Sequence, residues 1–152
     1  MGKRSRVYLD TSVPNAYLDE RDPSRMEKTR SFWGRIGQYQ IFISDLVIQE
    51  IEDIGDPVKR RRLLALVSGF QTMRSKNGEI ASLAEEYVGR GIIPMKHVED
   101  AVHIAVATFY EIDVLTSWNC EHIVKLKTKR EINVINVLLG YNQLEIVEPS
   151  ML

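Results

Sequence analysis

The feature that most constrains the fold is the alternation of short apolar segments with longer segments of helical pattern. Short strand-like runs end near residues 9, 43, 116 and 147, and helical segments separate them. Because strands joined through helices favour parallel pairing, this order predicts an α/β fold with a central, mostly parallel sheet flanked by helices. Ligands bind such sheets at the carboxyl ends of the strands. We therefore expect functional groups at Asp10, at Ser44 and Asp45, and at residues 117–119.

Turn and cap signals divide the rest of the chain into expected helices. A short helix should follow Ser12 as its cap, with Pro14 in its first turn. Further helices are expected over 24–37, after Ser44, over 59–70, over 79–88, from Pro94 to about residue 110, and from Asn119 onward. No internal repeat or linker interrupts the sequence, so a single domain over residues 1–152 is predicted.

Composition limits the classes of function. The formal net charge is -1, from 20 Lys and Arg against 21 Asp and Glu, so any nucleic-acid contact must rely on local basic patches. Cys120 is the single cysteine, which excludes an internal disulfide and a zinc site of several thiolates. The N-terminus has no apolar signal stretch, and the apolar run over 101–110 is too short to cross a membrane. We expect a cytoplasmic protein without a membrane partner.

Three acidic residues stand where apolar residues would be expected. After Ser44, apolar residues at helical spacing form one stripe, and Glu50 lies inside it between Val47 and Ile54. Asp100 lies on the helix expected from Pro94, which is apolar almost all round, and Asp10 directly follows an apolar strand. A buried carboxylate is costly unless it is paired or binds a metal, so these three acids are candidate ligands.

A shared divalent cation would explain why three acids gather at one edge of a sheet. Like charges that converge on one site do not all ionise cheaply, and a hard cation removes that penalty. Oxygen ligands are those that Mg²⁺ or Mn²⁺ prefers, and such an ion promotes phosphodiester hydrolysis. For each acid taken alone, a helix cap or a buried ion pair remains the alternative.

Five segments, in order, resemble the PIN-domain nucleases and, among them, the VapC-type toxin ribonucleases. They read YLDTSVPNAYLD, ISDLVIQEI, IPMKHVEDAVHIAVA, VLTSWNCEHIV and GYNQLEIVEPSML, and together they span nearly the whole chain. The resemblance implies that Asp10, Glu50 and Asp100 are the catalytic, metal-binding acids, the same three that the apolar faces single out. It also implies a three-layer PIN-like fold.

The fourth position of the site departs from the commonest PIN pattern. Where PIN domains often have Thr-x-Asp, this chain has Ser117, Trp118 and Asn119. We expect Asn119 to complete or orient the catalytic shell. Thr11, Ser12 and Ser117 are expected to lend hydroxyls around the acids as a second shell.

The resulting hypothesis is a Mg²⁺- or Mn²⁺-dependent endoribonuclease that hydrolyses RNA phosphodiester bonds, the toxin of a toxin–antitoxin pair. The resemblance further implies an antitoxin partner protein and a homodimer. The alternatives are a catalytically weak or inactive PIN-like module that binds RNA or protein, and a DNA-directed or structure-specific nuclease with the same site.

Basic clusters are candidate contacts for an RNA backbone, with plain solvated surface as the alternative for each. They comprise Lys3, Arg4 and Arg6; residues 59–62; and Lys125, Lys127, Lys129 and Arg130.

Other residues with catalytic side chains are expected to be structural. His103, three residues after Asp100, is predicted to be a partly buried structural histidine, with a ligand or proton shuttle as the alternative. His97 and His122 have no partner at metal-ligand spacing in the sequence.

Cys120 and the two tryptophans, Trp33 and Trp118, are predicted to be packing residues, with base stacking on Trp118 as an alternative. No Walker-type loop, Gly-x-Gly-x-x-Gly or Gly-x-Ser-x-Gly is present, which argues against nucleotide-binding and serine-hydrolase classes.

Overall fold

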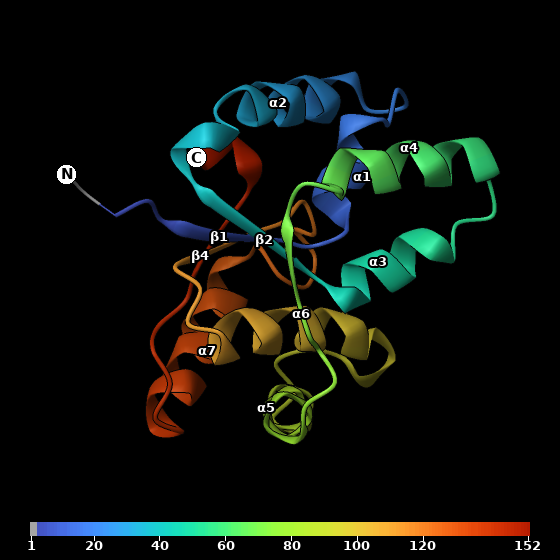
Figure 1. Cartoon of the computed structure of the whole chain (residues 1–152). Helices are drawn as coiled ribbons and strands as arrows, with labels where there is room; N and C mark the ends of the chain where they lie inside the picture. Colours follow the sequence, from blue (N-terminus) through green and yellow to red (C-terminus); the bar gives the residue numbers. More distant parts are fainter. Residues whose placement is uncertain (1–2) are drawn as a thin grey trace.

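The computed structural model describes residues 3–152 and arranges them in three layers, with a sheet between two groups of helices (Figure 1). The described residues form one five-stranded sheet in the order β3-β2-β1-β4-β5, and every neighbouring pair is parallel. The strands are β1 (Arg6–Leu9), β2 (Gln40–Ser44), β3 (Gln71–Met73), β4 (Val114–Thr116) and β5 (Glu145–Val147). The predicted α/β fold with helices on both faces of the sheet is confirmed.

Helices cover both faces of the sheet. In Figure 1, α1 (Ser12–Tyr17), α2 (Pro23–Gly34) and α4 (Pro57–Val67) lie above the strands. Below them lie α5 (Gly78–Gly89), α6 (Val98–Phe109) and α7 (Leu126–Leu138), while α3 (Asp45–Glu52) follows β2 and packs on α4. Short 3₁₀ turns occupy Ile36–Gln38, Met95–His97 and Pro149–Met151. No helix of the described part is both long and apolar enough to span a lipid bilayer.

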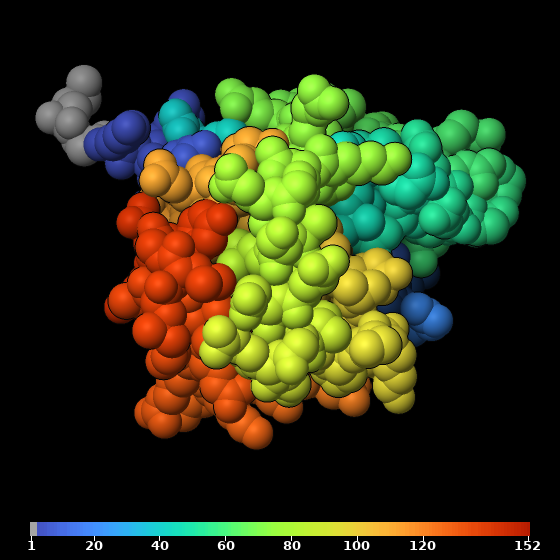
Figure 2. Space-filling model, turned by 90° about the horizontal axis from the view of Figure 1, so that it is seen from below, coloured from blue at the N-terminus to red at the C-terminus, as the bar shows by residue number. Residues whose placement is uncertain are grey.

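The core explains why these segments take these conformations. Val7, Tyr8 and Leu9 of β1 are fully buried, because the central strand of a parallel sheet is covered on both faces. α6 is buried almost all round, since it lies between the sheet and α5. Seen from below, α5 runs across the middle of this face, between the orange-red surface of α7 and the yellow start of α6 (Figure 2).

The strand order places a switch point beside β1. The chain runs outward from β1 to β2 and β3, and then returns to the other side of β1 to form β4. Connections therefore leave the carboxyl ends of β1 and β4 in opposite directions, which opens the crevice where open α/β sheets bind ligands. Asp10 follows β1 and Ser117 follows β4, so both stand at this crevice.

Several expected elements differ from the structure. β3 was not predicted, because it is a three-residue edge strand of mixed polarity whose Gln71 and Thr72 are exposed. α4 begins at Pro57 and ends at Val67, where 59–70 was expected. Thr11, not Ser12, holds the N-cap position of α1, because the Ser12 hydroxyl bonds to Asp10 instead.

The largest difference precedes α7. A helix was expected from Asn119, but residues 119–125 form turns and α7 begins only at Leu126. Lys125 has extended backbone angles, which end the turn region and start the helix. This loop brings residues after β4 back towards the start of α6.

Candidate active site

Asp10 lies at the carboxyl end of β1 and is only 4% exposed. Its Oδ1 accepts hydrogen bonds from the backbone N–H of Ser12, at 3.1 Å, and from the Ser12 hydroxyl. Its Oδ2 accepts a 2.6 Å hydrogen bond from the hydroxyl of Ser117. Burial raises the pKa of the Asp10 carboxyl, although the hydroxyls and the nearby His103 oppose that shift.

Glu50 lies on α3, and it hydrogen-bonds to the buried His103, which also hydrogen-bonds to Tyr8 of β1. Its Oε1 accepts hydrogen bonds from the Thr11 hydroxyl, at 2.7 Å, and from Nε2 of His103, at 2.6 Å. On the other side of the imidazole, Nδ1 of His103 bonds to the Tyr8 hydroxyl at 2.7 Å, which in turn bonds to the Ser44 hydroxyl at 2.8 Å. Both bonds to Glu50 end on the same oxygen, so Oε2 takes part in neither of them.

The Glu50–His103 pair is stabilised by charge. Burial alone would lower the pKa of His103, but the hydrogen bond and charge of Glu50, together with Asp10 and Asp100, outweigh it and raise that pKa. Burial would likewise raise the pKa of Glu50, but His103 and Thr11 bring it below its usual range. The two side chains therefore shift each other's pKa in the directions that favour an ion pair.

Asp100 lies in the first turn of α6 and is half-buried. Its Oδ2 accepts a 3.1 Å hydrogen bond from the side-chain amide of Asn119. The backbone N–H of Asn119 donates to the Ser117 hydroxyl at 2.9 Å, and that hydroxyl also bonds to Asp10. Burial raises the pKa of the Asp100 carboxyl, while Asn119 opposes that shift.

The structure therefore brings every predicted site residue to one edge of the sheet. Asp10 is held by Ser12 and Ser117, Glu50 by Thr11, and Asp100 by Asn119. The charges of all three acids act on the buried His103. Their oxygens suit a hard divalent cation. Each acid is nevertheless turned towards a hydrogen-bond partner of its own.

A tighter group of candidate metal ligands lies beside these acids. Within residues 3–152, His97, Asp100 and His122 form the one set of three His, Cys, Asp or Glu side chains whose ligand atoms all lie within 4.8 Å of one another. His97 and His122 have no partner at metal-ligand spacing in the sequence, but in the structure they meet Asp100 through the loop after β4.

Tyr8 was missed by sequence reasoning, since a tyrosine inside an apolar strand gives no sign of a polar role. Ser44 was expected at this edge of the sheet, and its hydroxyl bonds to that of Tyr8. His103 is buried and hydrogen-bonded on both nitrogens, as the prediction of a structural histidine requires. Trp118 is 5% exposed and its indole N–H donates to Thr29, which favours packing over base stacking. Cys120 carries an exposed free thiol, so it is not the packing residue that was expected.

The basic clusters occupy different places. Lys3, Arg4 and Arg6 precede or begin β1, at the opposite edge of the sheet from Asp10. Lys125 and Lys127 line a hollow together with His122. This hollow adjoins the candidate site, because His122 also lies within 4.8 Å of Asp100.

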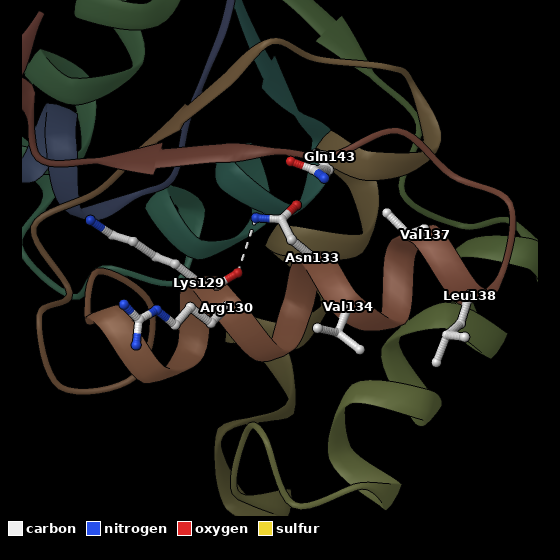
Figure 3. A pocket seen from close by; sticks show the side chains of 7 residues that line it. All are labelled: Lys129, Arg130, Asn133, Val134, Val137, Leu138 and Gln143. Atoms are coloured by element: carbon white, nitrogen blue, oxygen red, sulfur yellow. Dashed lines mark hydrogen bonds between the residues drawn. The ribbon is translucent and has the colours of Figure 1, made fainter.

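A separate apolar groove runs along α7. Val134, Val137 and Leu138 line it with Lys129 and Arg130 at one end (Figure 3). No side chain of the carboxylate network contributes to this groove. It is therefore a surface distinct from the candidate active site.

The fold agrees with comparison to known proteins. The family model of the PIN domain matches residues 7–117, and the chain belongs to this family. Among curated proteins, no relative matches the chain.

Two solved structures share its fold. One is FitAcB from Neisseria gonorrhoeae, with a TM-score of 0.62 at 12% identity over 96% of this chain and 99% of that one. The other is VapBC2 from Rickettsia felis, bound to a DNA fragment from their promoter. Its TM-score is 0.55 at 13% identity, over 93% of this chain and 98% of that one. The predicted resemblance to PIN domains is confirmed.

Proposed function

We propose that this chain is a Mg²⁺- or Mn²⁺-dependent endoribonuclease, the toxin of a toxin–antitoxin pair, with Asp10, Glu50 and Asp100 as its metal-binding acids. Membership of the PIN family supports a nuclease. The observation that carries the proposal is the set of hydrogen bonds that holds these acids around one crevice at the switch point of the sheet. Carboxylates concentrated at such a crevice suit a cation that also contacts phosphate.

The residues of the chain have distinct tasks in this proposal. When bound, Mg²⁺ or Mn²⁺ would supply activation of the attacking water and stabilisation of negative charge on the phosphate. Ser12 and Ser117 orient the carboxylate of Asp10 through its two oxygens. His103 and Thr11 fix Oε1 of Glu50, and neither of these two hydrogen bonds uses Oε2. Asn119 holds Asp100 through one oxygen.

RNA cleavage by purified protein tests the proposal. We expect cleavage of single-stranded RNA that requires Mg²⁺ or Mn²⁺, is lost with EDTA, and falls by at least about 100-fold in Asp10→Asn and in Glu50→Gln. Glu85→Gln, which neutralises an exposed acid on α5, is the matched control and should cleave like the wild type. Wild-type protein that binds RNA without cutting it in either metal would show instead an inactive binding module.

Calorimetry with Mn²⁺ gives an independent readout of the same acids. The wild type should bind the ion, and Asp10→Asn should weaken that binding while the fold is retained by circular dichroism. A DNA substrate tested beside RNA decides between the ribonuclease and a DNA-directed enzyme.

We also propose an antitoxin partner and a homodimer in the cytoplasm. Exposed large apolar side chains concentrate on and just after α7, and three of them, Val134, Val137 and Leu138, line the groove of Figure 3. This supports a protein partner on that face. The carboxylate crevice stays separate from this face, so binding there and RNA access are compatible.

A further inference from the structure

We propose that His97, Asp100 and His122 form a binding site for a divalent transition-metal ion, with Zn²⁺ as the preferred ion. This site lies next to the proposed Mg²⁺ or Mn²⁺ site. Two imidazoles and a carboxylate make a donor set that suits Zn²⁺ and disfavours Mg²⁺, which takes oxygen ligands. This site shares Asp100 with the proposed nuclease centre, but neither of its imidazole rings hydrogen-bonds to the carboxylates of that centre.

The geometry is close to that of a loaded site. The ligand atoms of the three side chains lie within 4.8 Å of one another. Zn²⁺ holds its nitrogen and oxygen ligands about 2.1 Å from the metal, which places tetrahedral ligands about 3.4 Å apart. Each pair therefore needs to close by at most about 1.4 Å, a shift that side-chain rotation supplies.

The backbone around the three ligands is already fixed. His97 ends the 3₁₀ turn at Met95–His97 and is the N-cap residue of α6, one turn before Asp100. His122 comes from the loop after β4, and its backbone N–H donates to the side-chain oxygen of Asn119 at 3.0 Å. Because Asn119 also donates to Asp100, it ties the two ligand-bearing segments together.

The imidazoles have few other partners. Their rings stack with centroids 4.1 Å apart, and both are partly buried. Among the described residues, neither ring makes a side-chain hydrogen bond. The nearest charged group to His122 is Oε1 of Glu121, at 3.7 Å and on a largely exposed side chain. The nitrogens of both imidazoles are therefore not engaged in the hydrogen bonds that hold a structural histidine such as His103.

Three protein ligands leave one coordination position open, as in catalytic zinc sites. His122 also lines the hollow that carries Lys125 and Lys127. The open position would thus lie beside basic side chains, where water, Glu121 or an anionic group could complete the shell.

Co²⁺ and Zn²⁺ binding test the site. Co²⁺ added to the purified wild type should give a visible d–d absorption band that stoichiometric Zn²⁺ removes. His97→Ala and His122→Ala should each weaken Zn²⁺ binding by about 100-fold or more, measured by competition with a chromogenic chelator. Lys96→Ala, an exposed neighbour of His97, is the control and should bind like the wild type.

The carboxylate variants separate this proposal from the proposed nuclease. Asp10→Asn and Glu50→Gln should lose RNA cleavage yet keep the Co²⁺ band. Folded His97→Ala and His122→Ala proteins that bind Zn²⁺ as tightly as the wild type would overturn the site, whatever the outcome for RNA cleavage. Loss of the band in Asp10→Asn but not in His97→Ala would likewise overturn it, because the ion would then occupy the carboxylate cluster.

Discussion

At the scale of single residues, the candidate site depends on a buried histidine, His103. Glu50 holds this histidine together with a second partner, which is not one of the predicted acids. His103 contacts Glu50 through one nitrogen and Tyr8 through the other, and it is 3% exposed. The Tyr8 hydroxyl reaches Ser44 as well, so one phenol satisfies two buried polar groups from different elements. This arrangement fixes the orientation of Glu50 from inside the core.

Tyr8→Phe tests that support. Removing the hydroxyl leaves Ser44 and Nδ1 of His103 buried without this partner, which should lower the free energy of unfolding by about 1–3 kcal/mol in urea denaturation. Tyr110→Phe is the control: its hydroxyl donates to the carbonyl of Arg74 at an exposed position, so its loss should cost within about 0.5 kcal/mol. Equal costs for the two substitutions would show that the buried phenol does not support the site.

At the scale of helices and strands, apolar runs and turn signals located most elements, because burial on both faces of a parallel sheet leaves a strong pattern. Residues 7–9 and 145–147 were predicted as strands and lie in β1 and β5. β3 was not predicted, because an edge strand buries little surface and Gln71 and Thr72 carry no apolar signal. The loop at 119–125 was wrongly predicted as helix, because its turns depend on hydrogen bonds to Asn119, such as that from Val124.

The candidate site, like the fold, was predictable where the signal is local in the sequence and not where it depends on tertiary contacts. Asp10, Glu50 and Asp100 contradict the apolar pattern around them, which is a local signal. The meeting of His97 with His122 is a tertiary event across 25 positions of sequence, set by the loop after β4. No spacing rule within one element could have found it.

The exposed face of α7 gives a prediction for the proposed homodimer. Val134, Val137 and Leu138 are 55–68% exposed at helical spacing, a pattern typical of a covered interface. Leu138→Glu should convert a species of twice 17.5 kDa to one of 17.5 kDa in size-exclusion chromatography with light scattering. Val58→Glu, at an exposed apolar position on α4, should leave the molar mass unchanged. Wild-type protein that is monomeric at micromolar concentrations contradicts the homodimer.

At the scale of the whole molecule, charge is nearly balanced, so binding of the proposed RNA substrate must rely on a local basic surface. The net charge of -1 gives no long-range attraction for a polyanion. The position of each basic cluster relative to the switch point then determines which cluster is expected to contact the RNA backbone. Lys125 and Lys127 adjoin the candidate site through His122, whereas Lys3 and Arg4 lie at the opposite edge of the sheet.

Salt dependence of RNA binding measures which cluster contacts phosphate. Single-stranded RNA binding is followed by fluorescence polarisation over a series of salt concentrations. The Asp10→Asn background is used because it is expected to prevent cleavage. Replacing Lys125 and Lys127 together by Ala should weaken binding and make the slope of log K against log salt shallower by about 1.4, since each lost phosphate contact on a single strand contributes about 0.7.

The same double change at Lys3 and Arg4 should leave both affinity and slope close to those of the background protein. If it lowers the slope as much as the change at Lys125 and Lys127, RNA must cross the amino ends of the strands, on the side away from the acids. Cleavage at Asp10, Glu50 and Asp100 would then need RNA to pass around the edge of the sheet. The molecule would be better described as an RNA-binding protein whose binding surface is unrelated to the carboxylate crevice.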